Sequence, residues 1–225
     1  MIPRVLEPEA MDTPEEVLQY DLMDHTEVNA RFVADFLAVH GPCRGGEILD
    51  VGTGTARIPI ALVEVDPHAR ILALDLAPNM LKQAAANIAR AGVTDRIRCL
   101  CGDVKGLGGL LANAVFEGVI SNTIIHHIPD PAPALSAMKA RVAPGGTLMV
   151  RDLARPDSRE EVARLVALYA GSETPAARGL FEASLNAALT LREIQELVRD
   201  QVGLPPDSAR MTSDRHWTIT WKRPG

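Results

Sequence analysis

The sequence predicts an α/β fold: a seven-stranded, mostly parallel sheet with helices on both faces and an antiparallel C-terminal strand. Two observations indicate this fold. From Glu47 onward, short and nearly continuous apolar runs alternate with amphipathic helical stretches, and the last residues alternate apolar side chains with threonine in the period of a strand. The 225 residues are expected to form a single domain (1–225), with an N-terminal helical cap (1–45), a core (46–153), a helical insertion or lid (154–200) and a C-terminal hairpin (201–225).

Two helices are expected ahead of the sheet. Thr13 offers an N-cap hydroxyl, Pro14 suits the first helical position, and a following glutamate can reach back to the cap. A second helix is expected over roughly 27–39, because apolar side chains recur there every four residues before a Gly-Pro pair: Val28, Phe32 and Phe36.

Five apolar runs are the candidate parallel strands, and helical patterns separate most of them. The runs are EILDV (47–51), RILAL (70–74), RIRCLC (96–101), EGVIS (117–121) and TLMVR (147–151). The helix after the second run is expected to end at Gly92, and a helix opening near Pro131 is expected to carry Leu135, Met138 and Val142. Pro144-Gly145-Gly146 is expected to make the turn into the fifth strand. Cys99 and Cys101 would share a face with Ile97, so core packing is expected for both.

The last third departs from this rhythm. One helix is expected from the spacing of Val162, Leu165, Val166 and Tyr169, followed by a loop over 171–179. Thr190 and Glu193 form a second capping box that opens the next helix. Ser213-Asp214 has turn chemistry, so the last two strands are expected to form a hairpin that includes Trp217, Ile219 and Trp221.

Composition excludes several kinds of partner. The net charge is −6, and no run of five basic residues occurs, so nucleic acid and anionic membrane surfaces are not expected as partners. The start lacks a basic segment followed by an apolar stretch, and a cytoplasmic monomer or homodimer is expected. The three cysteines, which include Cys43, lack CxxC spacing and are interpreted as reduced thiols, and nothing in the sequence requires a metal.

A glycine loop follows the first strand, and acidic residues follow the first three. Gly52-Thr53-Gly54 leads directly into a helix, which brings backbone N–H groups to a ligand. Arg57 occupies the place of the third glycine of a dinucleotide loop, which disfavours a dehydrogenase. Asp50, Asp75 and Asp103 lie at three successive strand ends, a pattern that suits a nucleoside ligand with a cationic amino acid portion and no phosphate.

These segments resemble the successive motifs of class I S-adenosylmethionine (SAM) dependent methyltransferases, which have a Rossmann-like fold. The motifs are ILDVGTGTA, ALDLAPNML, CGDV, ISNTIIHHIPDP and RVAPGGTLMVRDL, in the family's order across roughly 47–153. The resemblance implies SAM as the cofactor. It assigns Asp50, Gly52 and Gly54 to the methionine end, Asp75 to the ribose, Asp103 and the Val104 backbone to the adenine, Leu76 and Met80 to the adenine face, and Asn122 to the cavity beneath the sulfonium. Thr53 and Gly102 are further expected cofactor contacts.

The acceptor site is expected beyond the carboxyl ends of the strands. His126 and His127 follow the fourth strand, and a neutral imidazole there can accept a proton from an oxygen or nitrogen acceptor. Both histidines have an equally simple interpretation as packing or capping residues. The catalytic candidates are His126, Asn122, Tyr20 and His25, and the candidate substrate contacts are Asn29, His127, Arg151, Tyr169 and Arg215. For the two arginines, ion pairs with Asp152 and Asp214 are the alternative.

The predicted activity is methyl transfer from SAM to a small-molecule acceptor by in-line displacement. Two other uses of the same site stay open. One is cyclisation or elimination on SAM itself, and the other is a noncatalytic SAM- or nucleoside-binding subunit that regulates a partner.

Overall fold

A computed structural model describes residues 2–7 and 12–225. The chain divides into two compact units, each built from three segments. Unit 1 comprises Met1–Glu9, Thr123–Ala132 and Val150–Ile219, and unit 2 comprises Ala10–Asn122, Pro133–Met149 and Thr220–Gly225. The helical cap expected over 1–45 includes residues 8–11, which lie outside the described residues.

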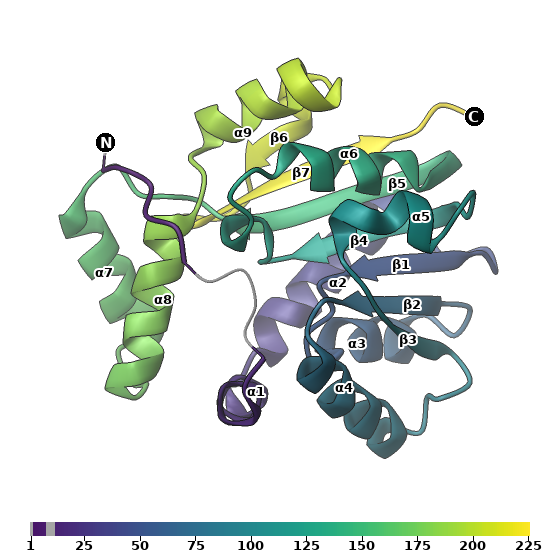
Figure 1. Ribbon diagram of the computed structural model, residues 1–225, viewed down its shortest axis with the longest axis horizontal. Coiled ribbons are helices and arrows are strands. Elements are labelled where there is room, and N and C mark those ends of the chain that lie inside the picture. The colour runs from purple at the N-terminus through teal and green to yellow at the C-terminus, as the bar shows by residue number, and fades with distance from the viewer. Residues whose placement is uncertain (1, 8–11) are drawn as a thin grey trace. The chain divides into compact units, whose positions relative to one another are not determined.

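The strands form one seven-stranded sheet with the order β3-β2-β1-β4-β5-β7-β6 (Figure 1). The pairs β1–β2, β1–β4 and β2–β3 are parallel, and β6 and β7 are antiparallel, as the sequence predicts. The strands are β1 (Glu47–Val51), β2 (Arg70–Asp75), β3 (Ile97–Cys101), β4 (Phe116–Asn122), β5 (Val142–Leu153), β6 (Ala209–Met211) and β7 (His216–Lys222).

Helices α1 to α6 accompany the parallel strands. They are α1 (Pro14–Leu22), α2 (Thr26–His40), α3 (Arg57–Val65), α4 (Pro78–Ala91), α5 (Leu107–Leu110) and α6 (Ala132–Ala140). The capping box at Thr13 and Glu16 opens α1, and Gly92 ends α4 in the left-handed conformation, both as predicted. The core of unit 2 packs α2 side chains against the sheet, with Phe32, Phe36 and Ile48 fully buried.

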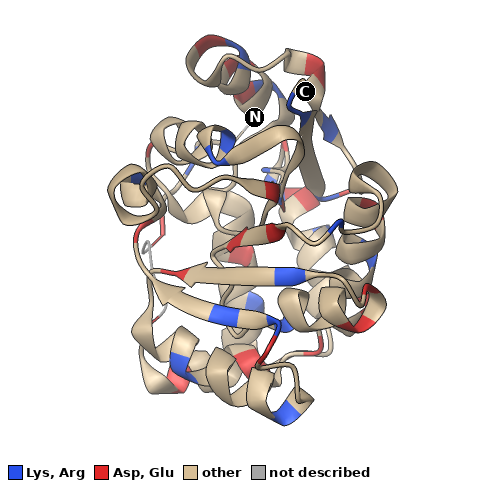
Figure 2. Cartoon of the chain, turned by 90° about the vertical axis from the view of Figure 1, so that its right-hand side faces the viewer, with Lys and Arg blue, Asp and Glu red and all other residues tan. Residues whose placement is uncertain are grey.

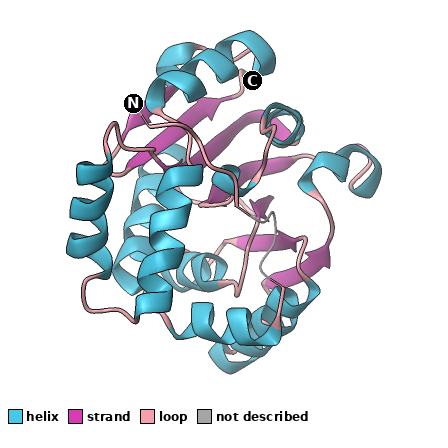
Figure 3. Ribbon diagram, turned by 60° about the vertical axis from the view of Figure 1, so that its left-hand side comes forward, coloured by secondary structure: helices cyan, strands magenta, loops and turns pink. Residues whose placement is uncertain are grey.

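Unit 1 contains the helices that follow β5. They are α7 (Arg159–Ala170), α8 (Pro175–Ala187) and α9 (Leu191–Leu197), and α9 continues into a π-helical turn, η3 (Val198–Val202). A short 3-10 turn, η4 (Pro206–Ser208), comes next, and another, η2 (Ile125–His127), lies between β4 and α6. Helices α7 and α8 lie side by side (Figure 3). Leu153, Leu165 and Leu185 form their common apolar cluster. The predicted capping box at Thr190 and Glu193 is present.

Three sequence predictions about these elements are wrong. The expected loop over 171–179 contains the start of α8, because Thr174 caps the helix and Pro175 occupies its first position. Strand β5 begins at Val142, which therefore does not belong to α6, and Pro144-Gly145-Gly146 lies within the strand. Gly145 takes a positive φ of 74°, yet its N–H still donates to Arg223 O at 3.0 Å, so the pairing continues through the irregular position.

The third correction concerns two cysteines. Cys99 and Cys101 are exposed, although core packing was expected for both. Their strand, β3, is the edge of the sheet. Ile97, at its start, reaches the core beside Ile88, whereas the later residues on the same face are left uncovered.

Candidate active site

The loop between β1 and α3 is a glycine turn tied to β2. Gly52 and Gly54 have φ values of 73° and 54°, which favour glycine. The N–H groups of Gly52 and Thr53 donate to Leu74 O at 2.8 and 2.9 Å. The loop is therefore held at the carboxyl end of the neighbouring strand, where ligands of parallel sheets bind.

Asp75, the last residue of β2, is fixed beside this loop. Its Oδ2 accepts a hydrogen bond from Gly54 N at 2.7 Å, and its Oδ1 accepts one from Ala77 N at 2.9 Å. Burial raises the pKa of Asp75, although these N–H groups oppose the shift. The N–H of Leu76 also interacts with this carboxylate, and a carboxylate has about four acceptor positions, so the oriented group can still receive a hydroxyl donor.

Asp50 is the buried partner of this carboxylate. It lies in β1 and is 2% exposed. Burial raises the pKa of Asp50 to about 7, and the charge of Asp75 adds to the shift. A cationic group placed beside both residues would favour their ionised forms, and the positively charged ammonium and sulfonium of SAM have this character.

The end of β3 supplies the third acidic position. Gly102 N donates to Asp75 O at 2.9 Å, which links the ends of β2 and β3. A Cβ at Gly102 would meet the end of the Leu110 side chain, which would have to move aside. The Asp103 carboxylate accepts Lys105 N at 2.8 Å and caps a short turn, η1 (Val104–Gly106). The structure thus brings Asp75, Gly102 and Gly54 together, while Asp103 has a capping role.

Tyr20 of α1 covers the glycine turn. Its Cε1 lies 3.6 Å from the position that a Cβ would take at Gly54, and its ring packs beside Met80 and Ala77. The rings of Tyr20 and His25 are 5.3 Å apart. Burial, together with the charges of Asp75 and Asp50, raises the pKa of Tyr20 to about 12, so the phenol is neutral near pH 7 and can donate a hydrogen bond.

A polar clamp that sequence reasoning missed holds α1 in place. Asp21 accepts hydrogen bonds from Arg57 Nε at 3.1 Å, Gln83 Nε2 at 3.0 Å and Asn87 Nδ2 at 2.8 Å. Asn87 also donates to Thr55 O at 3.0 Å. Burial would raise the pKa of Asp21, but the hydrogen bond from Asn87 and the charge of Arg57 hold it below its usual range. Arg57, considered from the sequence only as the missing third glycine, anchors the helix over the loop.

The histidine loop after β4 forms a second cluster, within unit 1. Thr123 begins it with a φ of 57°, an unusual value for a β-branched residue. His126 is 3% exposed and lies between two carboxylates, with Nδ1 2.6 Å from Asp152 Oδ1 and Nε2 3.2 Å from Glu7 Oε1. Burial alone would lower the pKa of His126, but Asp152 and Glu7 raise it to about 9. This environment favours a charged imidazolium over the neutral, proton-accepting imidazole that the sequence suggested.

The N-terminal segment 2–7 holds this loop, a role with no sequence signal. Arg4 donates to the carbonyl oxygens of His126, Ile128, Pro129 and Ala187 at 2.7–3.2 Å. Glu7 Oε1 also lies 3.3 Å from His127 Nδ1 and accepts the hydroxyl of Ser184 at 3.0 Å.

The remaining candidates fall into separate places. In unit 1, the Tyr169 hydroxyl donates to Asp214, and the Arg215 guanidinium lies 3.4 Å from the Tyr169 ring centroid and pairs with Asp214 at 3.3 Å. Arg151 Nε donates to Thr218 Oγ1 at 2.9 Å, while Asp152 pairs with His126. In unit 2, Asn122 ends β4, the half-buried Asn29 lies in α2, and Leu76 is 43% exposed.

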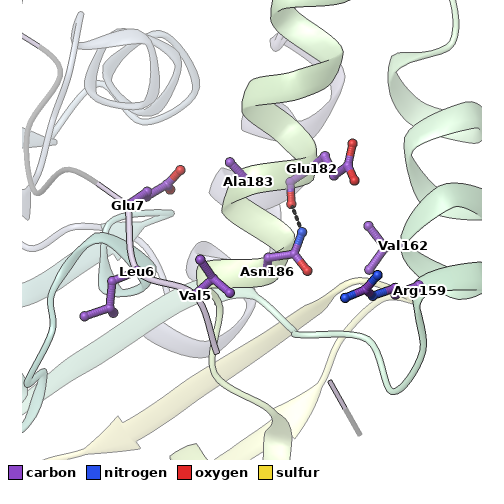
Figure 4. Close-up of a pocket in the computed structure, with 8 residues that line it drawn as sticks. All are labelled: Val5, Leu6, Glu7, Arg159, Val162, Glu182, Ala183 and Asn186. Atoms are coloured by element: carbon purple, nitrogen blue, oxygen red, sulfur yellow. Dashed lines mark hydrogen bonds between the residues drawn. The ribbon is translucent and has the colours of Figure 1, made fainter. Parts of the chain in front are cut away.

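Unit 1 also contains a cavity of about 350 Å³ between the N-terminal segment and the helices α7 and α8 (Figure 4). Glu182 and Asn186 of α8 are joined along one wall by a hydrogen bond of 2.8 Å from Asn186 Nδ2 to the Glu182 carbonyl. The other lining residues are Val5, Leu6, Glu7, Arg159, Val162 and Ala183.

Basic and acidic residues are interspersed along the described part of the chain. Lys and Arg segments alternate with Asp and Glu segments on the face that Figure 2 shows. Within residues 2–7 and 12–225, no helix is long and apolar enough to cross a membrane.

The sheet order, the glycine turn and the oriented carboxylate at the end of β2 define a class I SAM-dependent methyltransferase, with S-adenosylmethionine as its cofactor. The chain belongs to the methyltransferase domain family, whose model matches residues 43–201.

Known proteins similar to this chain include uncharacterised and named methyltransferases. An uncharacterised methyltransferase of Mycobacterium tuberculosis is 31% identical over 181 residues, which are 79% of this chain and 87% of that protein. A ubiquinone biosynthesis O-methyltransferase of Xylella fastidiosa is 30% identical over 54% of this chain and 47% of its own length. The crystal structure of a putative SAM-dependent methyltransferase of Methanococcus maripaludis covers 98% of both chains with a TM-score of 0.72 and 18% identity, and so supports the fold.

Proposed function

We propose that this methyltransferase transfers the methyl group of SAM to a small-molecule acceptor, and that SAM binds in unit 2 at the ends of β1, β2 and β3. One observation carries the site assignment. The Asp75 carboxylate is oriented by Gly54 N–H and Ala77 N–H beside the buried Asp50, so that two acidic groups and a glycine turn face the same end of the sheet.

The roles of the side chains follow from their chemistry. Asp75 is proposed to accept the two ribose hydroxyls, and Asp50 to attract the ammonium end while Gly52, Thr53 and Gly54 offer backbone contacts. Leu76 and Met80 would pack the adenine face, with Gly102, Asp103 and Val104 at its edge. Asn122 ends β4 and is proposed to line the cavity beneath the reacting centre.

When bound, SAM supplies a methyl group already activated by the positive sulfonium. The chain's own residues are left to align the reactants and exclude water, which together account for several kcal/mol of a typical barrier reduction. Tyr20, neutral and packed over the glycine turn, is proposed to donate a hydrogen bond and to close this side of the site. His25 and Asn29, on the same helical cap, are proposed acceptor contacts.

The acceptor is proposed to be a small molecule. The net charge of −6 disfavours a nucleic acid acceptor. The relative from Xylella is named for O-methylation in ubiquinone biosynthesis, which places phenols and quinols first among the acceptors to test. His127, Arg151, Tyr169 and Arg215 remain proposed acceptor contacts. We propose that His126, held between two carboxylates, orients the loop rather than taking a proton.

The cofactor assignment is tested by replacing Asp75. Asp75→Ala is expected to weaken the binding of S-adenosylhomocysteine by about 2–4 kcal/mol, because charge-assisted hydrogen bonds to the ribose and the anchor of the Gly54 turn are lost together. Isothermal titration calorimetry measures the change. Asp35→Ala, which removes an acid paired with Arg31 on the surface of α2, is the matched control and should bind as the wild type does. Equal affinity in both variants would remove Asp75 from the site.

The acceptor class is tested with radiolabelled SAM and a panel of phenols, quinols, amines, thiols and carboxylates. Methyl transfer leaves S-adenosylhomocysteine and a labelled acceptor in equal amounts. Methylthioadenosine as the product would instead support cyclisation on SAM. Efficient labelling of protein or RNA, with none of the small acceptors labelled, would overturn the small-molecule proposal.

A further inference from the structure

A cluster of three metal-ligating side chains lies in unit 2 at the amino ends of the strands, away from the glycine turn at their carboxyl ends. His40 ends α2, Cys43 lies in the connection from α2 to β1, and Glu117 is the second residue of β4. One ligand atom from each of the three lies within 4.8 Å of the others. Nitrogen, sulfur and oxygen donors therefore lie close enough together for one ion to reach all three.

His40 is held in an orientation typical of a metal ligand. Its ring stacks on Phe36 with centroids 4.8 Å apart, and its Nδ1 lies 3.1 Å from the hydroxyl of Thr147. The residue is 7% exposed, and its Nε2 is buried with no hydrogen-bond partner in the part of the chain that the structure describes. When Nδ1–H donates to the hydroxyl, Nε2 carries the lone pair, which is the usual arrangement of a histidine that binds a metal. A buried nitrogen without a partner is costly, and a cation would satisfy it.

The other two groups give the cluster an acidic lining. Cys43 is 5% exposed, and its thiol donates to the Asp66 carboxylate, which also accepts Cys43 N–H at 2.8 Å. The Glu117 carboxylate accepts Arg44 N–H at 3.2 and 3.3 Å and keeps further acceptor positions. Two carboxylates thus flank one thiol, an environment that suits a divalent cation.

We propose that His40 Nε2, Cys43 Sγ and a Glu117 carboxylate oxygen bind one divalent cation of the zinc class, with Asp66 or water as the fourth ligand. A thiolate, an imidazole and a carboxylate form a donor set that Zn²⁺ accepts in tetrahedral geometry. Binding forms the metal–sulfur bond and releases the thiol proton to solvent. The site joins the end of α2 to the starts of β1 and β4, so its role is structural.

The second cluster of this kind, Glu7 with His126 and His127, does not carry the same argument. Both imidazoles there already pair with the Glu7 carboxylate, and Asp152 holds the other nitrogen of His126. Its charges are balanced among its own side chains, whereas His40 Nε2 is not satisfied by any described residue.

Cobalt(II) titration of the chelator-treated full-length protein tests the site, because a cobalt–thiolate bond gives a charge-transfer band and a tetrahedral ion gives strong visible absorption. The wild type is expected to bind about one Co²⁺ per chain, to show both features and to lose them when Zn²⁺ is added. Cys43→Ser should abolish the thiolate band, and Glu117→Gln should weaken binding at least about tenfold. Cys99→Ser and Cys101→Ser, at exposed cysteines, are the matched controls and should titrate as the wild type does.

Thermal unfolding with and without Zn²⁺ is a second test, which does not depend on whether Cys43→Ser folds. Zn²⁺ is expected to raise the thermal midpoint of the wild type and of Cys99→Ser, and to raise that of Glu117→Gln by less at the same concentration. Absence of the thiolate band in the wild type, or an equal band in Cys43→Ser, would overturn the proposal. Binding of S-adenosylhomocysteine by the metal-free protein should be unaffected in either case, so failure of this site leaves the proposed activity untouched.

Discussion

Asp152 shows how one buried carboxylate organises a loop. It accepts hydrogen bonds from Ile125 N, His126 N and Leu153 N, and it pairs with the His126 ring. Burial would raise the pKa of Asp152, but the charge and hydrogen bond of His126 hold it below its usual range. Removing one partner of such a pair leaves an uncompensated buried charge, so the loop depends on both.

The pH dependence of stability should reveal this pair. The pKa of His126 is raised to about 9 in the folded state against about 6.5 in the unfolded chain, so its contribution is complete below pH 6.5 and is lost as the pH rises through 9. Relative to His126→Asn, the wild type is expected to lose about 3 kcal/mol of unfolding free energy across this window. Denaturant titrations between pH 6 and 10 measure the difference.

His68→Asn serves as the control for that experiment, since His68 is exposed and remote in sequence from the loop. Its stability profile should run parallel to that of the wild type. A parallel profile for His126→Asn as well would mean that the imidazole carries no extra proton in the folded protein.

At the scale of elements, polar contacts join both ends of α1 to the rest of unit 2. Before the helix, Asp12 accepts Asn79 N at 2.8 Å, and near its end Asp21 is held by side chains of α3 and α4. Tyr20 lies next to Asp21 and covers the glycine turn. The polar contacts therefore set the position of the side chain that closes the proposed SAM site.

Asp21→Ala is expected to destabilise the protein by about 1–3 kcal/mol, because the buried amide of Asn87 loses one of its two acceptors and Arg57 loses its partner. It should also weaken S-adenosylhomocysteine binding about three- to tenfold through the displaced Tyr20, as calorimetry can measure. Glu15→Ala, on the exposed face of the same helix, should change neither quantity. If stability falls while affinity stays at the wild-type value, α1 has no part in holding the cofactor.

At the scale of the whole molecule, periodicity predicted the elements well where a local pattern existed. The five parallel strands, the terminal hairpin and the capping boxes at Thr13 and Thr190 are all confirmed. The prediction of a loop over 171–179 is wrong because Thr174 caps α8 and Pro175 occupies the first position of that helix. Strand β5 was predicted too short because partners such as Arg223, far along the chain, keep the Pro-Gly-Gly segment paired.

The site could be predicted only in part, for a similar reason. Acidic residues at strand ends have a local signature, and the structure brings Asp50, Asp75 and the glycine turn together. The contacts of Asp21 with Asn87 and of Arg4 with the histidine loop join residues 66 and more than 120 positions apart. No local periodicity encodes such pairs, so they appear only once the chain is folded.

The three thiols differ in exposure because Cys99 and Cys101 lie in the edge strand β3, whereas Cys43 lies between α2 and β1. Their reaction rates can therefore report local opening of the structure. Cys99 and Cys101 are exposed, whereas burial and the hydrogen bond to Asp66 raise the pKa of Cys43 to about 12 and leave almost no reactive thiolate at pH 8. In metal-free protein, a maleimide should label two thiols quickly and the third only when the segment between α2 and β1 opens. Mass spectrometry would follow the slow phase, whose rate should increase with denaturant. Three thiols that react together would show that this segment opens as readily as the sheet edge.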